Sequence, residues 1–210
     1  MKINIEIPES INDVKLKQWQ KYTLLIDEKT SDEFANRKAL EIFYGIDGKH
    51  YNGLKVKDIE KIMGELIKAL SQKPTIVRQF ELSGINYGFI PNMDDITFGE
   101  FVDLDKYSSI KDYHKLMSIL YRPITETYKD TYLIEKYKGS NERMADMPLG
   151  VALSASAFFF DIAIQLTRDT LKSLKPQEEI QKKKRDLAVN GLGILASTPY
   201  QMATFLNTTK

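Results

Sequence analysis

TIVRQFELSGINYGFI, residues Thr75 to Ile90, is the stretch that decides the fold class of this 210-residue chain. Thr75–Leu82 and Ile85–Ile90 have the composition of two strands. Between them, Ser83-Gly84 suits a two-residue turn, because glycine tolerates the positive φ that such turns require. The stretch therefore predicts a β-hairpin.

The turn also predicts which residues pair across this hairpin. With Ser83-Gly84 at the turn, Leu82 faces Ile85 and Phe80 faces Tyr87. Opposed apolar and aromatic side chains stabilise neighbouring strands. We therefore expect an apolar and aromatic ladder on one side of the hairpin.

Two other segments favour strands. In Ile124–Tyr137, Thr, Tyr and Ile residues surround Lys129-Asp130, which indicates a second hairpin whose pairing the sequence leaves open. Lys2–Ile7 alternates polar residues with isoleucines and is closed by Pro8, which predicts an N-terminal strand.

Helical periodicity marks most of the remaining chain. The helices expected from it are Asn12–Asp27, which carries Trp19; one that begins at the capping-box pair Thr30 and Glu33; one over Val56–Leu70, ended by Pro74; one that begins at Thr97; one that begins at Ser109 and Asp112 and is stopped by Pro123; Leu149–Leu174; and Pro176–Asn190.

In the helix Leu149–Leu174, the stretch LGVALSASAFFFDIAIQL is apolar nearly all round. A membrane span is the alternative, but Asp161 and Gln165 interrupt it, and the uninterrupted apolar run is shorter than the ~18 residues that a span needs. We expect a buried core helix, whose Gly and Ala positions let other backbones approach closely. The chain then belongs to the α+β class: mainly helical, with an N-terminal strand, two β-hairpins and a buried apolar helix. We expect one compact domain over residues 1–190 and a C-terminal arm over residues 191–210.

The acidic stretch TFGEFVDLDKY, Thr97–Tyr107, raises the question of a reaction centre. Thr97 and Glu100 have the spacing of a capping box, in which each side chain satisfies a free backbone N–H of the first helical turn. Asp103 and Asp105 lie about 200° apart around a helix, so the acids do not converge. The stretch is therefore interpreted as architecture.

Phe98, Phe101 and Val102 follow at helical spacing and predict the buried stripe of this helix. The alternative to an architectural role is a divalent-ion site that uses Asp94, Asp95 or Asp103, although calcium-loop spacing is absent.

Composition and missing motifs argue against several classes of partner and active site. Thirty basic residues against twenty-nine acidic ones leave a net charge of +1, so no strong field attracts nucleic acid or an anionic membrane. The chain has no cysteine, which excludes disulfides and thiolate sites, and its N-terminus lacks the apolar core of a secretory signal. His50 and His114 have no zinc-site spacing, and the phosphate-loop and nucleophile-elbow motifs are absent.

We therefore predict no enzyme, no catalytic residue, no metal site and no cofactor. The basic run Lys182–Arg185 is predicted to be a solvated helix face, because Glu178 and Glu179 precede Lys182 and Lys183 at four-residue spacing. The alternative is a salt-sensitive phosphate contact without sequence specificity.

Leu187–Thr209 has no charged side chain. Free termini are normally polar, so this segment either packs on its own domain or is an arm that docks on a neighbouring subunit. The candidate interface residues in it are Ile194, Leu195, Tyr200, Met202, Phe205 and Leu206.

The succession YGFIPNMDDITFGEFVDLDKY, HKLMSILYRPI, YLIEKYKG and SASAFFFDIAI covers roughly Tyr87 to Leu171. In the order and composition of these segments, the chain resembles proteins encoded among the structural genes of tailed bacteriophages, especially the crAss-like phages of Bacteroidetes hosts. No functional residue carries over, because such families share packing segments and no catalytic signature.

The resemblance implies a non-enzymatic virion protein, a ring or head–tail connector component between portal and tail. Its implied partners are the portal, neighbouring tail or ring proteins and further copies of itself in a homo-oligomeric ring. It would be assembled in the bacterial host cytoplasm and kept in the virion. The alternative is a tail-assembly chaperone or another cytoplasmic protein-binding module.

Overall fold

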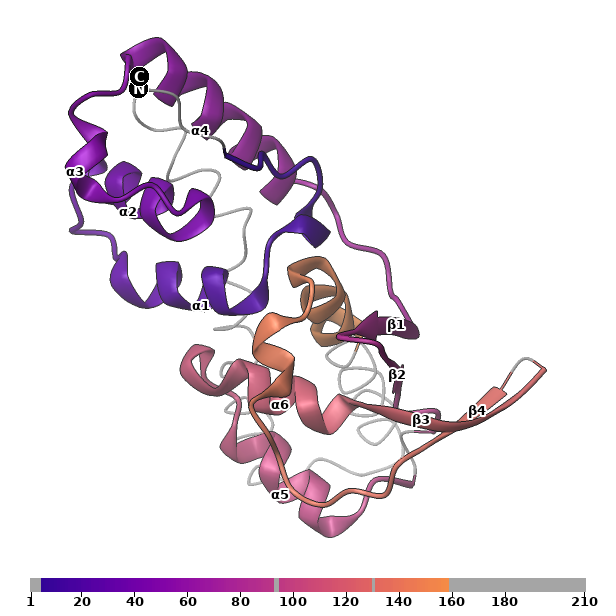
Figure 1. The fold of residues 1–210 in the computed structure, drawn as a ribbon. Helices are drawn as coiled ribbons and strands as arrows, with labels where there is room; N and C mark the ends of the chain where they lie inside the picture. The colour runs from indigo at the N-terminus through magenta and orange to yellow at the C-terminus, as the bar shows by residue number, and fades with distance from the viewer. Residues whose placement is uncertain (1–4, 93–94, 130, 159–210) are drawn as a thin grey trace, which may run out of the picture.

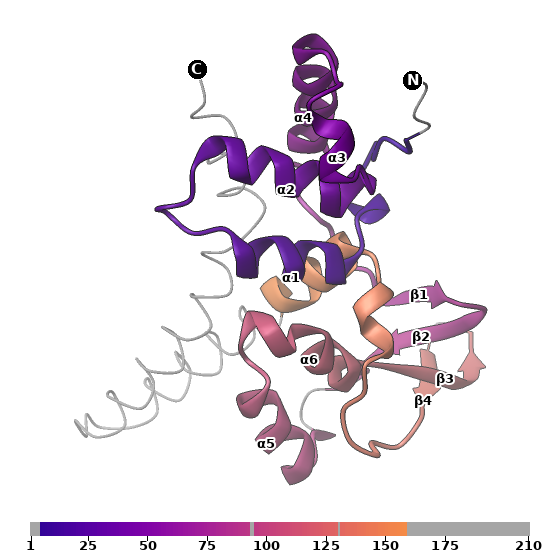
Figure 2. The same cartoon turned by 60° about the vertical axis from the view of Figure 1, so that its left-hand side comes forward.

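The computed structural model describes residues 5–92, 95–129 and 131–158, and it has the predicted mainly helical α+β fold. Figure 1 shows helices α1 to α4 in one half of the molecule, and the sheet with α5 and α6 in the other half. A helical segment over residues 149–158 lies between the two halves (Figures 1 and 2).

The N-terminal half contains helices joined by short turns. They are η1 (Ile11–Asp13), α1 (Leu16–Leu25), α2 (Asp32–Tyr44), α3 (Gly48–Tyr51) and α4 (Val56–Leu70). α4 has the predicted bounds, whereas the predicted helix Asn12–Asp27 is divided into η1 and α1.

The predicted capping box at Thr30 and Glu33 is wrong. Ser31 is the N-cap of α2, and its hydroxyl accepts a hydrogen bond from the backbone N–H of Phe34. The hydroxyl of Thr30 instead donates to Asp27 Oδ1 at 2.7 Å and accepts from the Asp27 backbone N–H at 2.9 Å. Thr30 therefore closes the preceding turn, which leaves its neighbour to cap the helix.

The predicted N-terminal strand is also wrong over its described part. Ile5–Ile7 has no strand conformation, and Ile7 is 39% exposed, although Ile5 packs partly on the core. A strand needs a partner, and Figure 1 places this end of the chain in the helical half, away from the sheet.

The first predicted hairpin is confirmed, including its register. β1 (Gln79–Leu82) pairs antiparallel with β2 (Ile85–Phe89), with Leu82 opposite Ile85 and Phe80 opposite Tyr87. The two turn residues, Ser83 and Gly84, have φ values of 52° and 78°. The rings of Phe80 and Tyr87 stack with their centroids 5.7 Å apart.

The second hairpin is confirmed as well and extends the same sheet. β3 (Tyr121–Tyr128) pairs with β4 (Thr131–Ile134), and β2 pairs with β3, so the strand order is β1-β2-β3-β4. Gly88 of β2 lies beneath Tyr132, where an added Cβ would come 2.3 Å from the tyrosine ring. The absence of a side chain there lets the Tyr132 hydroxyl donate to the Phe89 carbonyl at 2.8 Å.

The helices of the second half lie to one side of the sheet (Figures 1 and 2). They are α5 (Phe98–Lys106), η3 (Ile110–Asp112), α6 (Tyr113–Leu120) and η4 (Arg143–Asp146). α6 ends at Leu120 and the chain turns directly into β3, so Pro123 lies inside a strand and is not the residue that stops the helix.

The helical segment over residues 149–158 is the described part of the predicted apolar helix, and it is buried in the core as expected. Leu149, Ala152 and Ala155 are all 0% exposed. A Cβ on Gly150 would lie 2.3 Å from Asn12 Oδ1, so glycine permits the close approach of η1. Among the described helices, none has the length and apolarity that crossing a bilayer requires.

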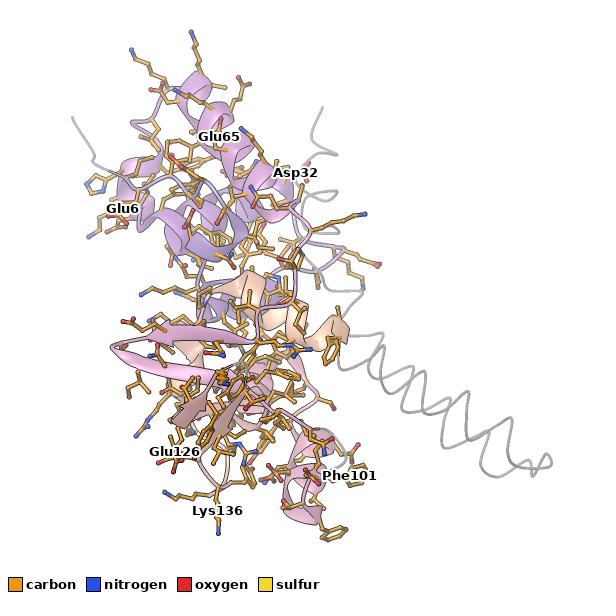
Figure 3. The ribbon with its side chains drawn as sticks, turned by 90° about the vertical axis from the view of Figure 1, so that its right-hand side faces the viewer. Glu6, Asp32, Glu65, Phe101, Glu126 and Lys136 are labelled. Atoms are coloured by element: carbon orange, nitrogen blue, oxygen red, sulfur yellow. The ribbon has the colours of Figure 1, made fainter. Side chains whose placement is uncertain are left out.

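One hydrophobic core joins both halves. The Leu16 N–H donates to the Met147 carbonyl at 2.9 Å, and the Leu149 N–H donates to the Val14 carbonyl at 2.8 Å. The largest side chains with less than 2% exposure are Trp19, Tyr22, Tyr113, Tyr121, Leu16, Leu40, Leu66, Leu70, Met117, Ile119, Leu120 and Met144. Figure 3 shows the side chains of the described residues.

Candidate protein-interaction surface

The acidic stretch forms α5, and its first turn is a capping box as predicted. The Thr97 hydroxyl accepts from the Glu100 backbone N–H at 3.3 Å, and Glu100 Oε2 accepts from the Thr97 backbone N–H at 2.7 Å. The Thr97 hydroxyl also donates to the same carboxylate oxygen at 2.6 Å. These bonds satisfy backbone donors at the helix start and fix where α5 begins.

Glu100 does more than cap the helix, because it makes an ion pair with β3. Its Oε1 lies 2.9 Å from Arg122 Nη2, and the two side chains are only 3% and 14% exposed. Removing one partner of such a pair leaves a desolvated charge without compensation. The pair therefore holds the polar side of α5 against the protein.

Asp103, on the same polar side of α5 as Glu100, also contacts the rest of the protein. The Tyr137 hydroxyl donates to Asp103 Oδ2, and burial, followed by this hydrogen bond, raises the pKa of Tyr137. Within the described residues, no three His, Asp or Glu side chains come together as metal ligands would. Asp94 of the alternative ion site lies outside the described residues.

The predicted buried stripe of α5 is wrong. Phe98 is 82% exposed, Phe101 is 60% exposed and Val102 is 45% exposed. Leu104 is the buried apolar side chain of this helix, together with Glu100. The ion pair to Arg122 sets the rotation of α5 about its axis, and this rotation turns the aromatic side outward.

Phe98, Phe101 and Val102, at positions i, i+3 and i+4, form one continuous strip, which we call the α5 apolar face. Figure 3 shows Phe101 at the periphery of the molecule, on the side of α5 away from the sheet. Single exposed apolar residues are ordinary on a protein surface, whereas a contiguous patch marks an interaction site. Two phenylalanines on a hydrogen-bonded helix are the kind of anchor that protein interfaces use.

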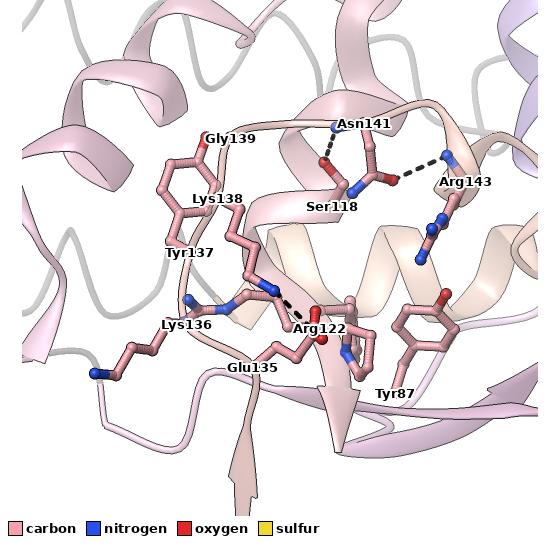
Figure 4. A pocket seen from close by; sticks show the side chains of 12 residues that line it. Tyr87, Ser118, Arg122, Glu135, Lys136, Tyr137, Lys138, Gly139, Asn141 and Arg143 are labelled. Atoms are coloured by element: carbon pink, nitrogen blue, oxygen red, sulfur yellow. Dashed lines mark hydrogen bonds and ion pairs between the residues drawn. The ribbon is translucent and has the colours of Figure 1, made fainter. Parts of the chain in front are cut away.

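The pocket in Figure 4 is a weaker candidate for a functional site than the α5 apolar face. It is a cavity of about 50 Å³ between β3 and the segment that follows β4, with Arg122, Tyr137 and Asn141 in its wall. Small-molecule sites are typically about 300–1,000 Å³. This cavity has room for water or a small ion and not for an organic substrate.

The two histidines are separate from each other. His50 is exposed on the short helix α3. His114 lies on α6, where Nδ1 is 3.1 Å from the Gln20 side-chain nitrogen and Nε2 is 2.5 Å from Glu142 Oε2. These polar contacts connect α6 with α1 and with the segment before η4.

The predicted interface residues all lie outside the described residues: Ile194, Leu195, Tyr200, Met202, Phe205 and Leu206. The same holds for the predicted helix Pro176–Asn190, the basic run Lys182–Arg185 and the boundary between residues 190 and 191. For the α5 apolar face, the sequence correctly predicted which residues share one side of the helix, but wrongly predicted that this side is buried. The sequence held no local signal for the outward rotation, because Arg122, which pairs with Glu100, lies on a separate element, β3.

Comparisons with protein-family models, with curated proteins and with solved structures found no match to this chain.

Proposed function

We propose that this protein is a structural component of a tailed-phage particle, one of the ring or connector proteins between portal and tail. The observation that carries the proposal is the α5 apolar face: an exposed aromatic strip on a helix anchored by a buried ion pair. Such a strip suits permanent contact with another protein, because apolar and aromatic anchors dominate interface energies. The sequence resemblance to phage structural proteins is the reason for proposing a phage particle as the assembly to which this contact belongs.

Two further features support this proposal. A net charge of +1 gives identical copies little electrostatic repulsion when they assemble side by side. Heterologous contacts close into a ring when the rotation between neighbours permits it, and a portal axis would impose that rotation.

The test is quantitative mass spectrometry of purified phage particles. A connector is present in a fixed stoichiometry with the portal protein. A protein that is abundant in infected cells and missing from particles contradicts the proposal and favours the assembly chaperone.

Imaging locates the protein within the particle. With a fusion tag at the N-terminus, we expect density in a ring around the tail axis. Tag signal spread over the capsid shell, or restricted to unassembled lysate, contradicts a place at the head–tail junction.

A further inference from the structure

We infer that the α5 apolar face of one copy binds the uncharged C-terminal segment, residues 187–209, of a second copy. The inference rests on the proposed function and names the contact that would hold neighbouring subunits. It makes the ring contact heterologous, with a surface on one copy and a chain terminus from the next.

The receiving surface is already formed in the single chain. The capping box and the Glu100–Arg122 ion pair fix α5, and Phe98 stays 82% exposed. A surface that keeps its shape before binding loses little conformational entropy on binding. The α5 apolar face thus has the properties of a receptor and not of a segment that folds on contact.

The occupant matches this surface in polarity. Residues 187–209 contain no charged side chain and carry apolar and aromatic residues, of which Tyr200 and Phe205 are the largest. Their rings can stack on Phe98 and Phe101, since aromatic pairs add stabilisation beyond buried area. A polar terminal segment would gain nothing from such a face.

Charge is complementary at the border of the contact. Asp95 and Asp105 are exposed near the two ends of α5, and the basic run Lys182–Arg185 precedes the uncharged segment, with Asp186 between them. The lysine of α5, Lys106, lies with its Nζ 4.9 Å from the centre of the Tyr107 ring. Basic and acidic groups around an apolar centre give orientation and raise the association rate.

A second copy is the occupant because the proposed ring needs a contact between copies, and the face and the segment are different parts of the chain that can meet head to tail. Complementary patches at different places on one molecule produce head-to-tail contacts, which close into a ring when the geometry allows. In such a ring each copy uses its α5 apolar face once and its C-terminal segment once. Every subunit then makes the same contacts, and neither apolar surface is left open.

The test is photo-crosslinking of the full-length protein with isotope labels. Phe98 is replaced by the photoreactive analogue p-benzoylphenylalanine in one preparation, which is mixed with unsubstituted protein grown in ¹⁵N. After illumination at high protein concentration, we expect crosslinked peptides that join position 98 to ¹⁵N-labelled residues 187–209. Crosslinks that join position 98 only to unlabelled segments, crosslinks to other regions, or no crosslink at all overturn the inference.

The matched control carries the same analogue in place of Val56, which is 71% exposed at the start of α4. We expect no crosslink to the C-terminal segment from that position. Equal crosslinking from both positions would show nonspecific adhesion of an apolar terminus and would overturn the inference.

A mixing experiment tests the head-to-tail arrangement. The variant Phe98→Ser/Phe101→Ser removes the receptor, and the variant Tyr200→Ser/Phe205→Ser removes the anchors of the segment. We expect each variant alone to lose about tenfold or more in association constant. Because the mixture retains one intact contact, we expect it to form dimers and no larger species.

Two outcomes of this experiment would overturn the inference: restored large assemblies in the mixture, or unimpaired association of either variant alone. The readouts are independent of the phage particle. A protein missing from particles would contradict the proposed function, whereas a crosslink confined to one chain would contradict only this contact.

Discussion

Two amphipathic helices, α4 and α5, carry similar apolar stripes and use them in opposite ways. In α4 the stripe is buried against the molecule's own core: Leu66 is 0% exposed and Leu70 is 2% exposed. In α5 the corresponding stripe faces outward, with Phe98 at 82%, and the side chains that pack inward are Glu100 and Leu104.

The difference shows what hydrophobic periodicity measures. It identifies a helix and the side that avoids water, but not which chain provides the cover. For α4 the cover is internal, since Leu66 lies in the hydrophobic core that also contains Leu40 of α2, and the Tyr44 hydroxyl donates to the Ile62 carbonyl at 2.8 Å. For α5 the inward direction is set by the ion pair with Arg122, and the apolar side remains available to a partner.

The largest expected effect comes from breaking the ion pair that orients α5. We expect Glu100→Gln to lower the free energy of unfolding by about 3–5 kcal/mol, because it leaves the guanidinium of Arg122 desolvated without a counter-charge. The glutamine oxygen can still accept from the Thr97 N–H, so most of the loss reports the ion pair. Urea unfolding followed by circular dichroism measures it.

The matched control for this variant is Glu33→Gln. Its carboxylate lies 2.9 Å from Arg37 Nη2, as in the buried pair, but the side chains are 73% and 41% exposed. We expect a loss of only about 0.2–1 kcal/mol, since water screens exposed pairs. Equal small losses from both substitutions would contradict the role of Glu100 in orienting α5.

The next effect concerns the buried stripe of α4. We expect Leu66→Ala to cost about 2–5 kcal/mol, because it leaves a cavity in the core. On the same helix, Val56 is 71% exposed, and Val56→Ala is expected to change stability by no more than about 0.5 kcal/mol. Thermal and urea unfolding of the two variants check the contrast, which would fail if both gave the same loss.

A smaller effect is expected at the cap of α5. Thr97→Ala removes the hydroxyl that accepts from the Glu100 N–H, and it should lower stability by about 0.5–2 kcal/mol. Thr97→Ser keeps the hydroxyl and should behave nearly as the wild type. A serine variant as unstable as the alanine variant would assign the effect to the lost methyl group instead of the cap.

Local rules predicted much of the fold from the sequence. The Ser83-Gly84 turn set the register of the first hairpin, because two-residue turns allow few geometries. The Thr97–Glu100 spacing likewise predicted the start of α5. Both features depend on atoms within a few residues of one another, which a sequence pattern records directly.

The features that were predicted wrongly depend on distant or competing partners. Thr30 had capping-box spacing, but Asp27 engages its hydroxyl. Ile5 and Ile7, in the described part of the predicted N-terminal strand, have no strand beside them. Glu100 and Arg122 meet through the fold, from α5 and β3, so the outward rotation of the α5 apolar face left no local signature.

The smallest expected effect on stability belongs to the α5 apolar face itself. For Phe98→Ser/Phe101→Ser we expect a change in unfolding free energy within about 0.5 kcal/mol for each site, because both side chains are mostly exposed in the single chain. If this double variant lowered the free energy of unfolding as much as Leu66→Ala, the α5 apolar face would be covered by its own chain. The stripes of α4 and α5 would then both be buried, which contradicts the difference between the two helices.

Sedimentation equilibrium of the wild type and this double variant, over a wide range of protein concentration, tests the central claim most directly. We expect the wild type to associate as concentration rises, whereas the equally stable variant stays monomeric or associates about tenfold or more weakly. Identical association curves for the two proteins would contradict the claim that the α5 apolar face is a protein-binding surface.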